Sequence, residues 1–169
     1  MKQGMAHMFR DIFQLGYVVR DLQEGIDYFE KTLGTVEVKL IEKQLTTGGL
    51  VYGEDKGDWV IDLALVNVGP TNLELIAPVS GPVDIYRDYI RPDAIATFHH
   101  IGVTVEDFEK TTAVLAENDK KWAISGYAPG FGKFGYADMR QEFGHYVECL
   151  EFEQNGIDFF KDLESVSGY

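Results

Sequence analysis

The chain repeats a nine-residue segment, and this repeat restricts its possible folds more than any other feature of the sequence. Residues 14–22 read QLGYVVRDL and residues 100–108 read HIGVTVEDF, with identical Gly, Val and Asp at the third, sixth and eighth positions. The segments that follow the two copies also match in kind. We therefore predict two similar structural modules in one chain of 169 residues.

Each copy of the repeat predicts a strand followed by a helix. Alternating apolar residues are typical of a strand, and Asp21 or Asp107 then stands where a helix N-cap is expected. In the first half the apolar residues of 22–33 form one helical stripe, and Gly34 is placed to end the helix. Three strand-like runs follow in each half, with Gly48-Gly49 among the expected turns; the runs are 36–45, 59–68 and 71–78, then 121–128, 133–140 and 144–152.

These elements predict an α+β fold in which two tandem β-α-β-β-β modules form a curved mixed sheet around a central cleft. The first module is expected at residues 11–79 and the second at residues 97–153. Residues 80–96 are expected to form a linker with a short helix, and residues 154–169 a C-terminal helix or tail.

Composition and charge exclude several classes of protein. The chain has 15 Lys and Arg against 28 Asp and Glu, a net charge of −13, which argues against nucleic acid as a partner. It has no apolar run of membrane-spanning length and no apolar signal segment near Met1, so we expect a cytoplasmic protein without membrane contact. Its one cysteine, Cys149, excludes an internal disulfide and a cysteine-rich zinc site, and is expected to be a buried thiol.

The alternation of side chains along a strand places polar residues of both halves on one open face. His100 shares this face with Gly102, and the repeat places Gln14 there as well, whereas His99 is expected to face the helix. In the last strand of each half, NLELI (72–76) and YVECL (146–150), a glutamate lies between apolar neighbours. A carboxylate in such a position is costly unless a partner or water reaches it.

Two modules related by a pseudo-two-fold axis would bring the polar positions together around one cleft. The set is one imidazole, two carboxylates and one amide oxygen, which suits a divalent cation. Its members are Gln14, Glu74, His100 and Glu148.

The same segments resemble the vicinal oxygen chelate superfamily, which includes glyoxalase I, methylmalonyl-CoA epimerase, extradiol dioxygenases and bleomycin-resistance proteins. The resemblance covers residues 11–152 and rests on QLGYVVRDL with NLELIAP, and on FHHIGVTVEDF with GHYVECLEF. It implies one divalent ion (Zn, Ni, Co, Mn or Mg) held by the first-strand residue and the last-strand Glu of each module, which are Gln14, Glu74, His100 and Glu148.

The resemblance also implies a metal-dependent lyase or isomerase that chelates substrate oxygens and removes a proton next to a carbonyl, with Glu148 and Glu74 as the catalytic carboxylates. The spacing of the second and third ligands resembles methylmalonyl-CoA epimerase, although Gln14 and Glu74 depart from its usual His and Gln. Val18 and Pro78 replace the glutathione-contacting Arg and Asn of glyoxalase I enzymes. Gln14 also argues against an extradiol dioxygenase, which binds iron with two His and one Glu.

The alternative is a metal-free binding protein of the bleomycin-resistance type, in which aromatic residues of the cleft stack on a cationic ligand. The candidate aromatic residues are Tyr17, Tyr127, Phe131, Phe134 and Tyr136. In the enzyme the partner is a small-molecule substrate, and an anionic one could contact Lys133, Arg140 and Tyr136. Exposed sheet edges, which a second chain can cover, predict a homodimer.

Overall fold

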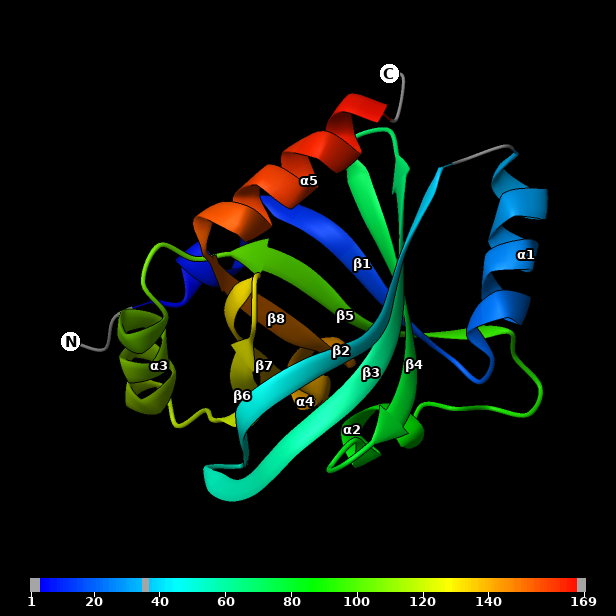
Figure 1. Cartoon of the computed structure of the whole chain (residues 1–169). Helices are drawn as coiled ribbons and strands as arrows, with labels where there is room; N and C mark the ends of the chain where they lie inside the picture. The colour runs from blue at the N-terminus through cyan, green and yellow to red at the C-terminus, as the bar shows by residue number, and fades with distance from the viewer. Residues whose placement is uncertain (1–3, 35–36, 167–169) are drawn as a thin grey trace.

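Eight strands form one closed barrel in the computed structural model, which describes residues 4–34 and 37–166 (Figure 1). Their order around the barrel is β1-β4-β3-β2-β6-β7-β8-β5. β1 runs parallel to β4 and antiparallel to β5, and β5 runs parallel to β8. The strands are β1 (Ile12–Val19), β2 (Val38–Val51), β3 (Glu54–Val68), β4 (Thr71–Ser80), β5 (Ala96–Thr104), β6 (Trp122–Ala128), β7 (Gly132–Met139) and β8 (His145–Phe152).

Helices cover the outside of the barrel and one of its ends. α1 and α3 lie on opposite sides, and α5 crosses one end of the barrel (Figure 1). Asp21 and Asp107 cap α1 and α3 as predicted, because their carboxylates accept hydrogen bonds from the backbone N–H groups of Glu24 and Lys110. The helices are α1 (Leu22–Leu33), α2 (Asp84–Arg87), α3 (Phe108–Glu117), α4 (Arg140–Phe143) and α5 (Gln154–Val166), preceded by a 3₁₀ turn at Ala6–Phe9.

The predicted α+β class and mixed sheet are confirmed, and the strands go further than the expected curved sheet because they close on themselves. Closure depends on β1 pairing with β5 at one seam and β2 pairing with β6 at the other. Every described strand therefore has two neighbours. The cleft expected from the sequence is the interior of this barrel.

The turn predicted at Gly48-Gly49 is wrong. β2 continues through both glycines, and the chain reverses at Tyr52 and Gly53. The glycines absorb a shift in register between β2 and β3 instead of making a turn. Gly49 allows close packing, because a side chain there would overlap the Trp59 ring.

Three apolar clusters hold the barrel together. One fills its interior around Trp59, Ile76 and Tyr136. A second packs α3 and the N-terminal turn against the outer face of β5 to β8, and a third packs α1 against β1, β3 and β4. The barrel interior is thus largely filled by apolar side chains.

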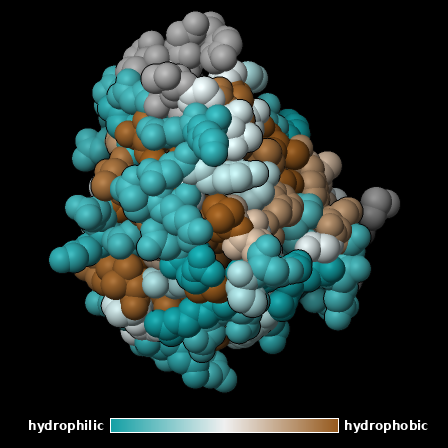
Figure 2. Space-filling view, turned by 90° about the vertical axis from the view of Figure 1, so that its right-hand side faces the viewer, coloured by the Kyte–Doolittle hydropathy of each residue, from teal (hydrophilic) through white to brown (hydrophobic). Residues whose placement is uncertain are grey.

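The outer surface is mixed in character. Figure 2 shows hydrophilic residues over much of one face, with apolar residues in small groups between them. The outward side chains Leu40, Leu45 and Leu50 of β2 are 52%, 40% and 39% exposed. Among the helices of the described ranges, none is long and apolar enough to cross a membrane.

Candidate metal centre and cavity

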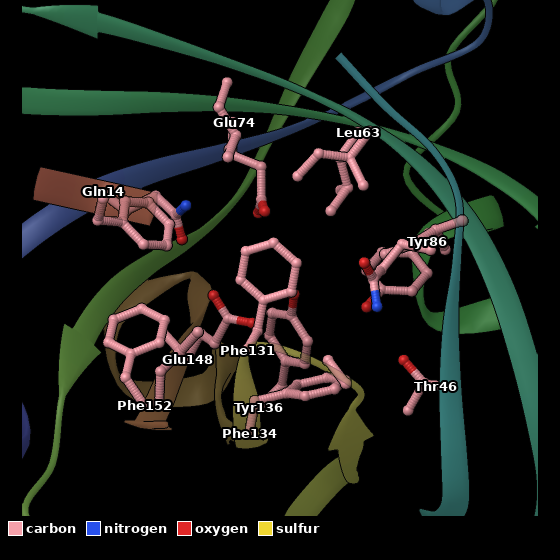
Figure 3. Close-up of a pocket in the computed structure, with 17 residues that line it drawn as sticks. Gln14, Thr46, Leu63, Glu74, Tyr86, Phe131, Phe134, Tyr136, Glu148 and Phe152 are labelled. Carbon is pink, nitrogen blue, oxygen red and sulfur yellow. The ribbon is translucent and has the colours of Figure 1, made fainter. Parts of the chain in front are cut away.

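The barrel brings together all four residues predicted to bind a metal. They lie on four consecutive strands, β4, β1, β5 and β8, and their exposed fractions range from 0 to 8%. His100 Nε2 is 3.4 Å from Glu74 Oε2 and 3.2 Å from Glu148 Oε2. The side chains of Gln14, Glu74 and Glu148 point toward one another in Figure 3.

Each of the four residues directs one unsatisfied polar atom into this space. These buried atoms have no hydrogen-bond partner within residues 4–34 and 37–166; they are Gln14 Oε1, Glu74 Oε2, His100 Nε2 and Glu148 Oε2. A buried polar atom without a partner costs free energy, of the order of 1–3 kcal/mol. The His and Glu atoms lie within 4.8 Å of one another, and together with the Gln14 oxygen they form a suitable donor set for a divalent cation.

Gln14 is oriented by a chain of amide side chains. Its Nε2 donates to Asn72 Oδ1 over 2.9 Å, and Asn72 Nδ2 donates to Asn67 Oδ1 over 2.8 Å. Because the amide nitrogen is engaged in this way, the oxygen is the free polar atom of the Gln14 side chain. The amide is therefore held as an oxygen donor, the form that a metal site requires.

The prediction that His99 points to the opposite face of β5 from His100 is wrong. Gly16 pairs with His100, but the next β1 residue, Tyr17, pairs with Phe98, so residue 99 is an extra residue in β5. This β-bulge turns both histidines into the barrel, and His99 packs against Tyr136 and Tyr146. Bulges of this kind often redirect a side chain next to a functional site.

His99 determines which nitrogen of His100 carries a proton. His99 Nε2 lies 3.2 Å from the carbonyl oxygen of Ile85, which can only accept, so this nitrogen donates. Burial lowers the pKa of His99 well below its usual value and keeps the ring neutral, so its Nδ1 accepts from His100 Nδ1 over 3.0 Å. The neutral His100 ring then has its lone pair on Nε2, beside the two carboxylates.

Two glycines of the repeat make room for the polar residues of the opposite half. Gly16 pairs across the strands with His100, and a Cβ at Gly16 would overlap the imidazole ring. Gly102 pairs with Gln14, and a Cβ there would lie 2.7 Å from Gln14 Oε1. The repeated Gly is therefore explained by the close approach of side chains at the β1–β5 seam.

Burial and charge oppose each other in this site. Burial alone lowers the pKa of His100, but the charges of Glu148 and Glu74 outweigh it and raise the pKa to about 9. Burial raises the pKa of Glu74, and the neighbouring charge of Glu148 raises it further, while His100 lowers it. A cation among these groups, whether a proton on His100 or a metal ion, offsets the repulsion of the carboxylates.

A cavity of about 60 Å³ adjoins the four polar residues and includes Gln14, Glu74 and Glu148 in its wall. Of the aromatic residues predicted to line the cleft, Phe131, Phe134 and Tyr136 do so. The other two do not line it: Tyr17 packs outside the barrel against Phe29 and Phe98, and the Tyr127 hydroxyl donates to Glu153.

The basic residues suggested as anion contacts lie away from the cavity wall. Lys133 forms ion pairs with Glu109 and Glu151, and Arg140 pairs with Asp138. Cys149 faces the outer apolar cluster, and burial raises the pKa of its thiol, as expected of an inert packed cysteine.

Tyr86 lines the cavity and was missed as a site residue by sequence reasoning. It belongs to α2, where the only signal was a short helical pattern. Its hydroxyl is buried and has no hydrogen-bond partner in the described part of the chain. Burial raises its pKa well above the usual value, so the hydroxyl remains a hydrogen-bond donor at neutral pH.

Comparison with known proteins identifies a family and a fold. Residues 13–137 match the family described as Glyoxalase/Bleomycin resistance protein/Dioxygenase superfamily. Comparison with curated proteins finds no match.

Similar solved structures include methylmalonyl-CoA epimerase from Mycobacterium tuberculosis, with 15% identity, a TM-score of 0.58 and coverage of 86% of this chain and 90% of that one. A methylmalonyl-CoA epimerase in complex with methylmalonyl-CoA and NH4+ has 16% identity, a TM-score of 0.57 and coverage of 85% and 94%. A hypothetical protein from Bacillus halodurans C-125 has 16% identity, a TM-score of 0.57 and coverage of 85% and 95%. At these identities the likeness concerns the fold alone.

Proposed function

The chain belongs to the glyoxalase/bleomycin resistance protein/dioxygenase superfamily, and from this premise we propose that it is a metal-dependent lyase or isomerase. In this proposal it removes a proton from a carbon next to a carbonyl group. The observation that carries the proposal is the convergence of four buried, unsatisfied donor atoms beside a cavity. The superfamily and the epimerases among its structural neighbours are consistent with this chemistry.

We infer that Gln14, Glu74, His100 and Glu148 hold one divalent ion, with Zn, Ni, Co, Mn and Mg as candidates. Such an ion would polarise chelated substrate oxygens and stabilise the negative charge that develops when a proton leaves the adjacent carbon. The contacts that orient Gln14 and His100 favour this role. Asn72 accepts a hydrogen bond from Gln14 Nε2, and His99 accepts one from His100 Nδ1. The Gln14 oxygen and His100 Nε2 are thereby left for the ion.

We assign proton transfer to the two carboxylates. Glu148 and Glu74 both line the cavity as well as the polar centre, so each can reach a substrate bound between them. A carboxylate with little water around it is a stronger base than one in solvent. Because the two stand on strands from different halves of the barrel, one can remove a proton and the other return it, which suits an isomerase.

Metal content is the direct test of this proposal. Protein purified without chelator should contain close to one divalent ion per chain, and His100→Ala should lose it. His145→Ala is the matched control, because His145 is half-buried and packs on Phe98 and Phe143 away from the cavity. Wild-type protein that takes up no metal at neutral pH would contradict the four-ligand site and favour a metal-free binding protein.

The reaction itself is tested by exchange of the substrate proton with solvent. We would screen 2-oxoaldehyde–thiol adducts and 2-methylacyl-CoA thioesters for uptake of deuterium at the carbon next to the carbonyl. Metal-dependent exchange that disappears in His100→Ala supports the proposal. A metal-loaded protein that exchanges none of these compounds would restrict the substrate to other carbonyl compounds, and exchange that survives removal of the metal would contradict the proposal.

We also propose that residues 11–79 and 97–153 are duplicated modules, with the linker at 80–96 and the C-terminal segment from 154, and that the protein is a homodimer. The closed barrel removes the open sheet edges that first suggested a dimer. The exposed leucines of β2 offer a different contact surface. A mass near 19 kDa by light scattering at micromolar concentration would contradict the dimer.

A further inference from the structure

We propose that the part of the substrate enclosed in the barrel is a compact, uncharged apolar group, of which a phenyl ring is the simplest example. This inference rests on the proposed function, because it places the chelating oxygens of the substrate at the four polar residues and the remainder of the enclosed part in the cavity. It names a substrate class that neither the family nor the structural neighbours specify.

The cavity wall is mostly apolar beyond the polar centre, with Gln44, Thr46, Tyr86 and Tyr136 as its other polar side chains. Ile61, Leu63 and Leu65 of β3 contribute aliphatic side chains to the wall. Phe134 of β7 and Leu150 of β8 also line it. Burial of an apolar group against these aliphatic and aromatic walls is favourable by about 25 cal/mol for each Å² removed from water, whereas a charged group would lose its hydration without a counter-charge.

Charge excludes an anionic group from the same space. Among the described residues that line the cavity, none is a Lys or Arg, and the two charged members are Glu74 and Glu148. The double positive charge of a divalent ion would be balanced by these two carboxylates. A carboxylate on the substrate would therefore enter a low-dielectric space in which no positive charge is left to balance it.

Size and closure limit the enclosed group to a compact one. The cavity volume is about 60 Å³, which leaves room for only a few water molecules or one small group. α5 crosses this end of the barrel and contributes Phe160 to the cavity wall (Figure 1). The Phe160 ring packs against Phe13 and Phe152, with ring centroids 5.5 and 5.0 Å apart, so the helix is fixed over the space by aromatic contacts.

The test uses hydroxamates, which chelate divalent ions through two oxygens and can be varied at one position. Binding to the metal-loaded protein is measured by calorimetry for acetohydroxamate, benzohydroxamate, 4-nitrobenzohydroxamate and 4-carboxybenzohydroxamate. The phenyl compound should bind at least about tenfold more tightly than the methyl compound. The carboxylate should bind at least about tenfold more weakly than the nitro compound, which has the same shape and no net charge.

Two neighbouring phenylalanines of α5 provide matched variants. Phe160→Ala should weaken benzohydroxamate by about tenfold and leave acetohydroxamate unchanged, because only the phenyl ring reaches the wall that Phe160 forms. Phe159 packs against Phe131 and Phe160 without lining the cavity, so Phe159→Ala should change neither compound by more than about threefold. Equal effects of the two variants on benzohydroxamate would contradict the proposed position of the ring.

Failure of this inference can be separated from failure of the proposed function. If metal binds but the carboxylate compound binds as tightly as the nitro compound, the apolar substrate class is wrong and the metal site stands. If the protein takes up no metal, acetophenone is titrated into the metal-free protein by NMR. Binding of acetophenone that Phe160→Ala weakens and Phe159→Ala does not would support the apolar site on its own, and absence of binding would overturn it.

Discussion

The two halves of the barrel place equivalent residues in one site but hold them in different ways. Gln14 and His100 occupy matching positions in β1 and β5, as do Glu74 and Glu148 in β4 and β8. In the first half the amide of Asn72 fixes Gln14 through a regular strand pairing. In the second half a bulge adds His99, and this extra residue orients His100.

This difference separates what the repeat supplies from what local departures supply. The repeat fixes where the four side chains meet, because strand alternation and the paired glycines apply equally to both halves. The contacts that differ between the halves determine the chemistry. Asn72 leaves the oxygen of Gln14 free, and His99 leaves the lone pair of His100 on Nε2. Tyr86 and Phe160, which complete the cavity, come from α2 and α5, outside the repeated elements.

The largest effect is expected from the two carboxylates, which the repeat makes equivalent. Glu148→Gln keeps a coordinating oxygen but removes the base, so turnover should fall by at least about a hundredfold while much of the metal remains. Glu74→Gln should have a milder effect if Glu74 is mainly a ligand, and an equally large one if both residues transfer protons. The measurement is solvent deuterium exchange together with metal content.

The Glu148→Gln result also tests whether Glu74 and Glu148, which occupy equivalent positions in the two halves, have equivalent roles in catalysis. Exchange at the wild-type rate in Glu148→Gln would remove this residue from the mechanism. A loss of metal equal to that of His100→Ala would instead show that the variant reports on binding and not on proton transfer.

A smaller effect is expected from the two orienting residues, which the repeat does not make equivalent. His99→Phe removes the acceptor for His100 Nδ1, and loss of a residue that orients a ligand typically weakens metal binding about 10- to 100-fold. His99→Gln should restore affinity within about threefold, because a Gln amide can accept from His100 and donate to the Ile85 carbonyl. Metal affinity is measured by competition with a chelating dye.

Asn72→Leu provides the matched change in the first half. It frees the Gln14 amide to rotate, so we expect a weaker effect than that of His99→Phe, about three- to tenfold. The ¹⁵N chemical shifts of His100 in the metal-free protein above pH 9, where its ring is neutral, give a second readout, because only His99→Phe should change which ring nitrogen carries the proton. Unchanged His100 shifts in His99→Phe would show that His99 is a packing residue only.

Much of this site could be predicted from the sequence because it depends on periodicity. Alternation along a strand and the register of the repeat were sufficient to select Gln14, Glu74, His100 and Glu148 before any contact was known. The position of His99 could not be predicted, since a bulge is a local shift in pairing between two distant strands and leaves no pattern in either one. Tyr86 could not be predicted for a similar reason, because only the closed barrel brings α2 against the cavity.

The paired glycines test the seam between the halves. Gly16→Ala places a Cβ within the space of the His100 ring, which is held by His99 and cannot move freely, so we expect a loss of about 1–3 kcal/mol in the free energy of unfolding. Gly102→Ala meets the end of the Gln14 side chain, which is easier to displace, so its cost should be smaller. Chemical denaturation of both variants measures the difference, and equal costs would mean that the two ligands are held with equal rigidity.

The effect of pH is expected to have opposite signs in the metal-free and metal-loaded protein. Because folding raises the pKa of His100 from 6.5 to about 9, its contribution to the stability of the metal-free protein is fully present below pH 6.5 and is lost as the pH rises through 9. A metal ion must displace the same proton, so its apparent affinity should rise by up to about tenfold per pH unit over this range. The difference between the melting temperatures of the metal-loaded and metal-free protein should therefore widen from pH 6.5 to 8.5. Calorimetry at pH 7 in buffers of different ionisation enthalpy should detect about one proton released per ion.

In Glu148→Gln this proton release should fall, because the charge that most raises the pKa of His100 is gone. A wild-type protein that binds metal at pH 7 without releasing a proton would show that His100 is already neutral and that the carboxylates of the two halves do not share its charge.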